Sequence, residues 1–389
     1  MGGRGMRMRS LLFALAFLAA CSDNELAPVA DPPALAPLAP FASDTMLVVS
    51  SEGTLQNLAV LSLNTATGAV GSLPGSPVDV KANIGDAETL AADPARRRVF
   101  LGSNIDGVIA VCDLDLAGRP VPVAGSPFAA ERRAVSSMRI TPAGDSLFVG
   151  YHAESILSRY AVSPAGTLTL AQSIPTVAGS FVETMRQVGN VLYVGFLTTS
   201  NIVGYQLDGG GAFVVDGDGL PTIVADVTTA ERPDDLIAIE TRLYCSLAQA
   251  GAIDAFTVGG DGSLTRLAGA PYTFPGIGGF ELIAAQPGGA FIAVGAETPT
   301  AAVGLYAVAP DGTLIPNGAA LTLHDRRGGP EGLTFSADGR FLFVCDHVGQ
   351  GLYVLETTGG VPAFAAMPRF ELPGRQIDVL RLNIAVDPN

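Results

Sequence analysis

The amino-acid sequence predicts an all-β fold built from repeated sheets, and three observations lead to this prediction. Short apolar runs, rich in aromatic and β-branched residues, alternate with turns that contain Gly, Asp and Pro. The 389 residues include 47 Gly and 27 Pro and show no helical heptad pattern, which is typical of a chain with many turns and strands. One strand motif also recurs along the chain from residue 45 onward.

The recurring motif predicts the architecture of these sheets. Its seven copies are spaced by roughly 50 residues, which fits the four-stranded blades of a seven-bladed β-propeller. The copies are LVVSS (47–51), VFLGS (99–103), LFVGY (147–151), LYVGF (192–196), LYCSL (243–247), FIAVG (291–295) and LFVCD (342–346). The first repeat lacks a leading strand, and the unassigned RQIDVLRLNIA (375–385) supplies one. We therefore expect the C-terminal strand to close the ring in blade one, which removes open sheet edges.

The stretch GPEGLTFSADGRFLFVCDHVGQGLYVLE (329–356) illustrates the local pattern of a blade. Its apolar runs predict buried strands on either side of the turn SADGR, where Gly339 supplies the positive φ that the reversal needs. The acid Glu331 nevertheless stands at the start of a strand, and Asp346 and His347 follow the next one. The position of these polar residues suggests a role at one end of the blade.

Composition limits the classes of partner. Lys and Arg number 22 against 37 Asp and Glu, a net charge of −15 that argues against a nucleic-acid partner and favours cationic ligands or metal ions. Hydrophobic residues make up 48% of the chain, enough for a large core. We expect one large domain that is monomeric.

The N-terminus predicts export and lipid anchoring. Residues 1–21 combine a basic start, an apolar segment too short to span a bilayer and LAAC, a sequence that resembles a bacterial lipobox ending at Cys21. Lipidation of Cys21 would attach the protein to a membrane of the bacterial cell envelope, on the periplasmic side or at the cell surface. An ordinary secretory signal with an incidental cysteine is the alternative. Residues 22–44 are rich in Pro and predict a semi-rigid linker, followed by the propeller in residues 45–389.

A row of acids precedes the inner strands of the predicted blades. The equivalent positions, two residues before an apolar reference position, are Glu88, Ser136, Glu183, Asp234, Glu281, Glu331 and Asp378. In a propeller these positions lie near one mouth of the central channel, and the loops that carry Asn104, His152, Asp346 and His347 reach the same face. Arg139, Arg186 and Arg381 follow the reference positions, and strand alternation points them away from the acids. His324, beside Asp325, is expected to be solvated.

Several motifs resemble a known family. VAGSPF (123–128), LPGSPV (73–78), LAGAPY (267–272) and FSADGRFLFVCDH (335–347) are similar to blade motifs of the seven-bladed propeller lactonases, the 6-phosphogluconolactonase and carboxymuconate-cyclase type. The resemblance covers residues 45 to 385 and implies the fold and, more distantly, lactone hydrolysis. An acidic mouth with Glu331 where a basic residue would help should repel a phosphorylated substrate, so a neutral lactone is expected.

Two kinds of site fit the acids. Glu88, Glu183, Asp234, Glu281, Glu331 and Asp378 offer hard oxygen ligands suited to Ca²⁺, which would polarise a lactone carbonyl while a carboxylate or His347 activates water. Glu331, His347 and Glu183 are then the catalytic candidates, with Asp346, His152 and Asn104 as ligand-binding candidates. Alternatively, each acid accepts backbone hydrogen bonds from a neighbouring loop, and repetition copies this structural role around the ring.

Two functions therefore remain open. One is a lipid-anchored lactone hydrolase with a small-molecule ligand at the channel mouth. The other is a non-catalytic propeller that binds a protein or an envelope component there. Metal-clustered acids would favour the first function, and acids saturated by backbone donors would favour the second.

Overall fold

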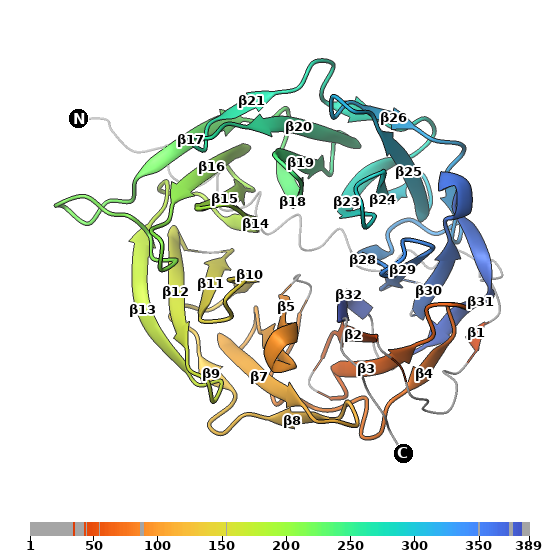
Figure 1. The fold of residues 1–389 in the computed structure, drawn as a ribbon, viewed down its shortest axis with the longest axis horizontal. Coiled ribbons are helices and arrows are strands. Elements are labelled where there is room, and N and C mark those ends of the chain that lie inside the picture. Colours follow the sequence, from red (N-terminus) through yellow and green to blue (C-terminus); the bar gives the residue numbers. More distant parts are fainter. Residues whose placement is uncertain are drawn as a thin grey trace, which may run out of the picture. The chain divides into compact units, whose positions relative to one another are not determined.

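The protein is a seven-bladed β-propeller, as a computed structural model shows (Figure 1). The structure describes residues 34–35, 43, 45–53, 55–85, 89–152, 154–348, 351–372 and 376–382. Within these residues the strands form seven antiparallel sheets arranged in a ring, with only two short 3-10 helices, Pro94–Arg96 and Thr358–Gly360. The predicted fold class is confirmed. The predicted signal segment with Cys21 and the candidate Glu88 lie outside the described residues.

Blades one to four each follow the four-stranded pattern that the repeats predict, from the innermost strand outward. Blade one contains β32 (Gln376–Leu382), β2 (Met46–Ser51), β3 (Leu58–Leu63) and β4 (Val70–Ser72). Blade two contains β5 (Leu90–Asp93), β6 (Arg98–Gly102), β7 (Val108–Leu114) and β8 (Pro120–Pro122), with β9 (Phe128–Ala129) also paired to β7. Blade three contains β10 (Val135–Ile140), β11 (Ser146–Tyr151), β12 (Ile156–Val162) and β13 (Leu168–Pro175). Blade four contains β14 (Val182–Val188), β15 (Val191–Phe196), β16 (Asn201–Gln206) and β17 (Ile223–Thr228).

Blades five to seven each carry one short additional strand. Blade five contains β18 (Pro233–Ile239), β19 (Arg242–Leu247), β20 (Ala252–Val258) and β21 (Leu264–Arg266), with β22 (Tyr272–Thr273). Blade six contains β23 (Gly278–Ala285), β24 (Phe291–Thr298), β25 (Ala302–Val308) and β26 (Leu314–Pro316), with β27 (Leu321–Thr322). Blade seven contains β28 (Pro330–Phe335), β29 (Phe341–Asp346), β30 (Gly351–Glu356) and β31 (Ala363–Glu371), with β1 (Ala34–Leu35).

The C-terminal strand closes the ring. β32 pairs antiparallel with β2, with Leu380 opposite Val48, so the last strand of the chain becomes the inner strand of the first blade. This confirms the predicted closure. The strand β1 adds to the outer edge of blade seven, where Ala34 pairs in parallel with Arg369. Two residues of the Pro-rich segment thus belong to a sheet.

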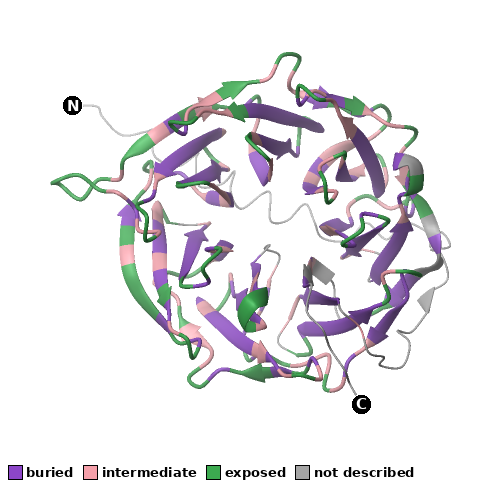
Figure 2. Ribbon diagram, viewed as in Figure 1, coloured by how far each residue is buried: buried purple, intermediate pink, exposed green. Residues whose placement is uncertain are grey.

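The hydrophobic core lies between the blades. Each buried apolar cluster among the described residues draws side chains from two neighbouring sheets, so seven clusters fill the seven interfaces. Most second strands are buried over their whole length because both faces contact another blade, as in β29, and β19 and β24 are only partly buried at their ends. The outer strand β13 is exposed at most of its positions, as Figure 2 shows by colour.

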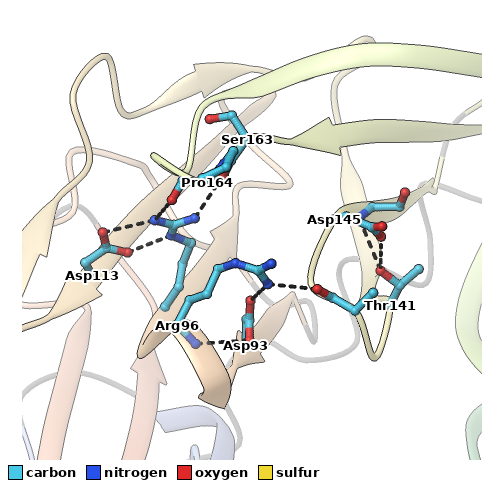
Figure 3. A network of polar contacts seen from close by, with 10 residues as sticks. Asp93, Arg96, Asp113, Thr141, Asp145, Ser163 and Pro164 are labelled. Carbon is cyan, nitrogen blue, oxygen red and sulfur yellow. Dashed lines mark hydrogen bonds and ion pairs between the residues drawn. The ribbon is translucent and has the colours of Figure 1, made fainter.

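Polar contacts between blades supplement this packing. Tyr193 and Tyr244 occupy the same position in β15 and β19, and each hydroxyl donates to the carbonyl of a turn glycine in the next blade, at 2.8 Å to Gly262 and 3.0 Å to Gly312. Blade two contacts blade three through arginines (Figure 3): the Arg98 guanidinium pairs with Asp113 at 2.6 Å and donates to the Pro164 carbonyl at 3.1 Å. The predicted glycine turns therefore also connect adjacent blades.

Three smaller observations concern a turn, the cysteines and the helices. Gly339 has a φ of +70°, as the hairpin predicts. Cys112, Cys245 and Cys345 are buried free thiols. Within the part of the chain that the structure describes, no helix has the length and apolar character needed to cross a membrane.

Candidate functional site

The candidate site forms where the inner strands of the blades begin. In β14 and β28 a register shift leaves one residue without a partner in the ladder, and this residue is Glu183 in one strand and Glu331 in the other. Such β-bulges redirect side chains and are frequent beside functional sites. Comparable shifts occur in β18 and β23, at Asp234 and Glu281. We call the residues that gather here the mouth site: His152, Glu183, Arg232, Asp234, Glu281, Glu331 and His347.

A histidine and a glutamate from different blades meet at one end of the mouth site. His152 follows β11 in blade three, and its Nε2 atom lies 3.0 Å from Oε2 of Glu183 in blade four. Both side chains remain accessible, with 33% of His152 and 21% of Glu183 exposed. A histidine held by a carboxylate is a common arrangement for proton transfer.

Arg232 lies at the centre of the mouth site. It precedes β18, and its guanidinium is 3.7 Å from Oδ1 of Asp234, while its Nε is buried without a hydrogen-bond partner in the described residues. Burial lowers the pKa of Arg232, but the carboxylates of Asp234, Glu281 and Glu183 outweigh burial and raise the pKa overall. The arginine therefore stays charged and retains a donor for an oxygen ligand.

Two acids beside Arg232 favour the protonated form. Burial raises the pKa of Asp234 well above its usual range, Arg232 opposes this shift and Glu183 adds to it. Burial also raises the pKa of Glu281, and repulsion from Asp234, Glu331 and Glu297 adds to the effect. Burial and mutual repulsion therefore shift both Asp234 and Glu281 toward the protonated form.

A second histidine and glutamate pair lies on the other side of Glu281. Nδ1 of His347, after β29, is 2.6 Å from Oε1 of Glu331 in β28 of the same blade. These side chains are less accessible than the first pair, at 19% for His347 and 11% for Glu331. The mouth site thus runs from blade three to blade seven, with a histidine and glutamate pair at each end and an arginine between them.

The structure places Asp346 behind this site. Oδ2 of Asp346 is 2.7 Å from Nε2 of His324, and both side chains are almost completely buried. The expectation that His324 is solvated is therefore wrong, because its loop folds back over the end of β29. Gly329 makes this possible: a Cβ atom there would lie 2.6 Å from Oδ1 of Asp346, and the residue has a φ of +139°.

The remaining candidates lie apart from the mouth site or outside the described residues. Oδ1 of Asn104 accepts the Gly85 N–H at 2.9 Å, a structural contact. Asp378 pairs with Ser50 in the ladder, directly after the register shift in β32. It therefore lies one residue beyond the unpaired position that Glu183 and Glu331 occupy in their strands. Ser136 in blade three donates its hydroxyl to the Val182 carbonyl at 2.7 Å. The row of acids is therefore shorter than the sequence alignment predicts, and Glu88 is not described.

Several carboxylates of the mouth site contact protein donors. In the described ranges, no three His, Cys, Asp or Glu side chains come together in an arrangement that could hold a metal ion. Glu183 and Glu331 instead contact histidines, and Asp234 accepts the Ala248 N–H at 2.9 Å. Calcium binding stays a prediction from the sequence.

Asp378 should make stability depend on pH. Burial raises its pKa to about 7, with Arg139 and backbone N–H groups opposing the shift. Because the folded state binds this proton more tightly than the unfolded state, stability falls as pH rises from about 4 to 7. Asp378→Asn should remove this loss. The substitution should therefore increase the free energy of unfolding by about 2 kcal/mol more at about pH 8 than at about pH 5. Urea denaturation of both proteins at each pH measures it, and parallel pH profiles would contradict it.

The fold and the mouth site together define a class: a seven-bladed propeller whose inner strands and adjoining loops present histidine, carboxylate and arginine side chains at one end. Solved structures with this fold include the periplasmic gluconolactonase of Pseudomonas aeruginosa, with a TM-score of 0.71, 18% identity and coverage of 87% of this chain and 99% of that one. A Bacteroides fragilis protein provisionally assigned as a 6-phosphogluconolactonase also has a TM-score of 0.71, with 14% identity and coverage of 87% and 97%. This similarity establishes the fold.

Comparisons of the sequence itself gave no match. No protein-family model and no curated protein matches this chain.

The sequence analysis did not identify Arg232, although RPDD (232–235) places an arginine two residues before one of the acids. That spacing was the available signal.

Proposed function

We propose that the protein hydrolyses a neutral, unphosphorylated lactone at the mouth site. The observation that carries this proposal is the position of Arg232, a guanidinium whose buried Nε has no hydrogen-bond partner among the described residues and which lies near several carboxylic side chains. The similarity to propeller lactonases of known structure supports the same reaction class.

Each chemical requirement of lactone hydrolysis has a candidate group. Oε2 of Glu183 is occupied by His152, so its second carboxylate oxygen is the candidate acceptor for a proton from the attacking water. The water oxygen then bonds to the carbonyl carbon, and Arg232 stabilises the negative charge that develops on the carbonyl oxygen. The bond between the carbonyl carbon and the ring oxygen breaks next.

The protonated acids complete the reaction. Glu281 or Asp234, whose pKa is raised by burial and which therefore favours the protonated form, donates its proton to the departing ring oxygen, which becomes the hydroxyl of the product. The product is a hydroxy acid, and its carboxyl proton returns to the solvent or to the site. A phosphorylated lactone suits this site less well, because four carboxylic residues surround the single arginine.

Glu183→Gln tests the assignment of the base. We expect the wild-type protein to open neutral aldonolactones such as glucono-1,5-lactone faster than their phosphorylated counterparts, and the variant to lose about a hundredfold in kcat/KM. A pH-indicator assay in slightly acidic buffer, where spontaneous opening is slow, measures both. The matched control is Glu240→Gln, an exposed glutamate at the opposite end of β18. Equal activity of the two variants would refute the role of Glu183, and no turnover of any lactone would refute the proposed function.

A further inference from the structure

Two arginines on neighbouring inner strands lie together outside the mouth site. The side chain of Arg139, in β10 of blade three, reaches across to blade four, where its Nε donates to the Met185 carbonyl at 2.6 Å. Arg186 is the next residue in β14, and the inner strands β10 and β14 contact each other. Both arginines are half-buried, so water still reaches them. The two guanidinium groups are close enough for Arg139 to disfavour the charge on Arg186.

Neither arginine has an ion-pair partner among the residues that the structure describes. Arg139 uses only backbone carbonyls, at Met185 and, at 3.5 Å, at Met138. Arg186 makes no hydrogen bond and no ion pair with the described residues, although Asp235 attracts it from farther away. Several N–H donors of these two cations therefore have no acceptor among the described residues.

The nearby aspartates are engaged by other donors. The carboxylate of Asp235 accepts the Leu236 N–H at 2.7 Å, the Ile283 N–H at 3.3 Å and the Thr184 hydroxyl at 3.4 Å. Asp378 accepts backbone N–H groups of Val379 and Leu90. These aspartates reduce the local positive potential, but their oxygens do not neutralise the arginines by direct contact.

The arrangement is unfavourable without a ligand. Burial lowers the pKa of Arg186, and repulsion from Arg139 lowers it further. A half-buried cation that faces a like charge costs stability unless an anion compensates it. Titratable groups perturbed by burial and by a like charge are often found at functional sites.

We propose that Arg139 and Arg186 bind the carboxylate group of a small organic acid near the propeller axis. A planar carboxylate suits guanidinium groups, which donate two parallel N–H hydrogen bonds. Asp235 and Asp378 disfavour a doubly charged phosphate, since they add negative charge close to the same arginines. The site is independent of the proposed hydrolysis, because it involves no residue of the mouth site.

Ligand-observed NMR with ¹³C-labelled acetate tests this site in the full-length protein. At constant ionic strength, the wild-type protein should broaden the acetate signal, and inorganic phosphate should compete more weakly than unlabelled acetate. Arg186→Gln should weaken acetate binding at least about tenfold. The matched control is Arg119→Gln, which removes an arginine that is 58% exposed and should leave acetate binding unchanged.

Thermal unfolding provides a second, independent measurement. Acetate should raise the melting temperature of the wild-type protein but not that of Arg186→Gln. Without acetate, Arg186→Gln should be at least as stable as the wild type, because it removes the repulsion from Arg139. Equal acetate binding by wild type and Arg186→Gln would overturn the site, and stronger competition by phosphate than by acetate would overturn the choice of a carboxylate. Lactone turnover enters neither measurement, so failure here is distinct from failure of the proposed hydrolysis.

Discussion

Arg232→Met is expected to lower kcat/KM for a neutral lactone by about a thousandfold. The guanidinium is the cation that we assign to the developing oxyanion, and methionine preserves much of its length and packing while removing every donor. The effect should fall mainly on kcat, because the interaction is strongest when the carbonyl oxygen carries negative charge. Steady-state kinetics across a series of substrate concentrations separates kcat from KM.

The neighbouring acids provide an internal check on the Arg232 prediction. Arg232 opposes the rise in pKa of Asp234 and Glu281, so its loss should raise both values further. The residual activity of Arg232→Met should therefore have a pH profile shifted toward higher pH. Arg232→Lys, which keeps the charge without the planar donor group, should recover part of the rate. An unchanged kcat in Arg232→Met would show that the oxyanion is stabilised elsewhere.

Asp346→Ala is expected to destabilise the fold by about 3 kcal/mol. The side chains of Asp346 and His324 are at most 1% exposed, and Oδ2 of Asp346 lies 2.7 Å from Nε2 of His324. Removing the carboxylate therefore leaves the imidazole without this contact. Nδ1 of His324 already has no hydrogen-bond partner in the described residues, which makes the loss of Nε2 contact more costly. Urea denaturation followed by circular dichroism measures the change in the free energy of unfolding.

A double-mutant cycle separates this interaction from simple loss of volume. Replacing both residues, with His324→Leu and Asp346→Leu, removes both polar groups together and should be less destabilising than the sum of the two single changes. Additive effects of the two substitutions would show that the contact contributes no coupling energy. Because Asp346 precedes His347, a destabilised Asp346→Ala protein should also lower activity through displacement of the Glu331 and His347 pair.

The sequence determined the fold because the information is repeated. Each of seven copies of a short apolar strand specifies the same four-stranded sheet, and an unmatched strand near the C-terminus must pair with the blade that lacks one. A deviation from the motif in one copy therefore has little effect on the predicted architecture. The same redundancy placed Glu183, Asp234, Glu281 and Glu331 at one end of the inner strands.

Only the tertiary structure decided how these side chains are used. A register shift of one residue moved Asp378 out of the row, and no periodicity in the sequence reports where a strand bulges. The contacts of His152 with Glu183 and of His324 with Asp346 join residues 31 and 22 positions apart. The proposed role of Arg232 depends on carboxylates from several blades. The side chain of Arg139 donates to a carbonyl of the next blade. Local sequence sets each strand, but the chemistry depends on distances between blades, which only the closed ring fixes.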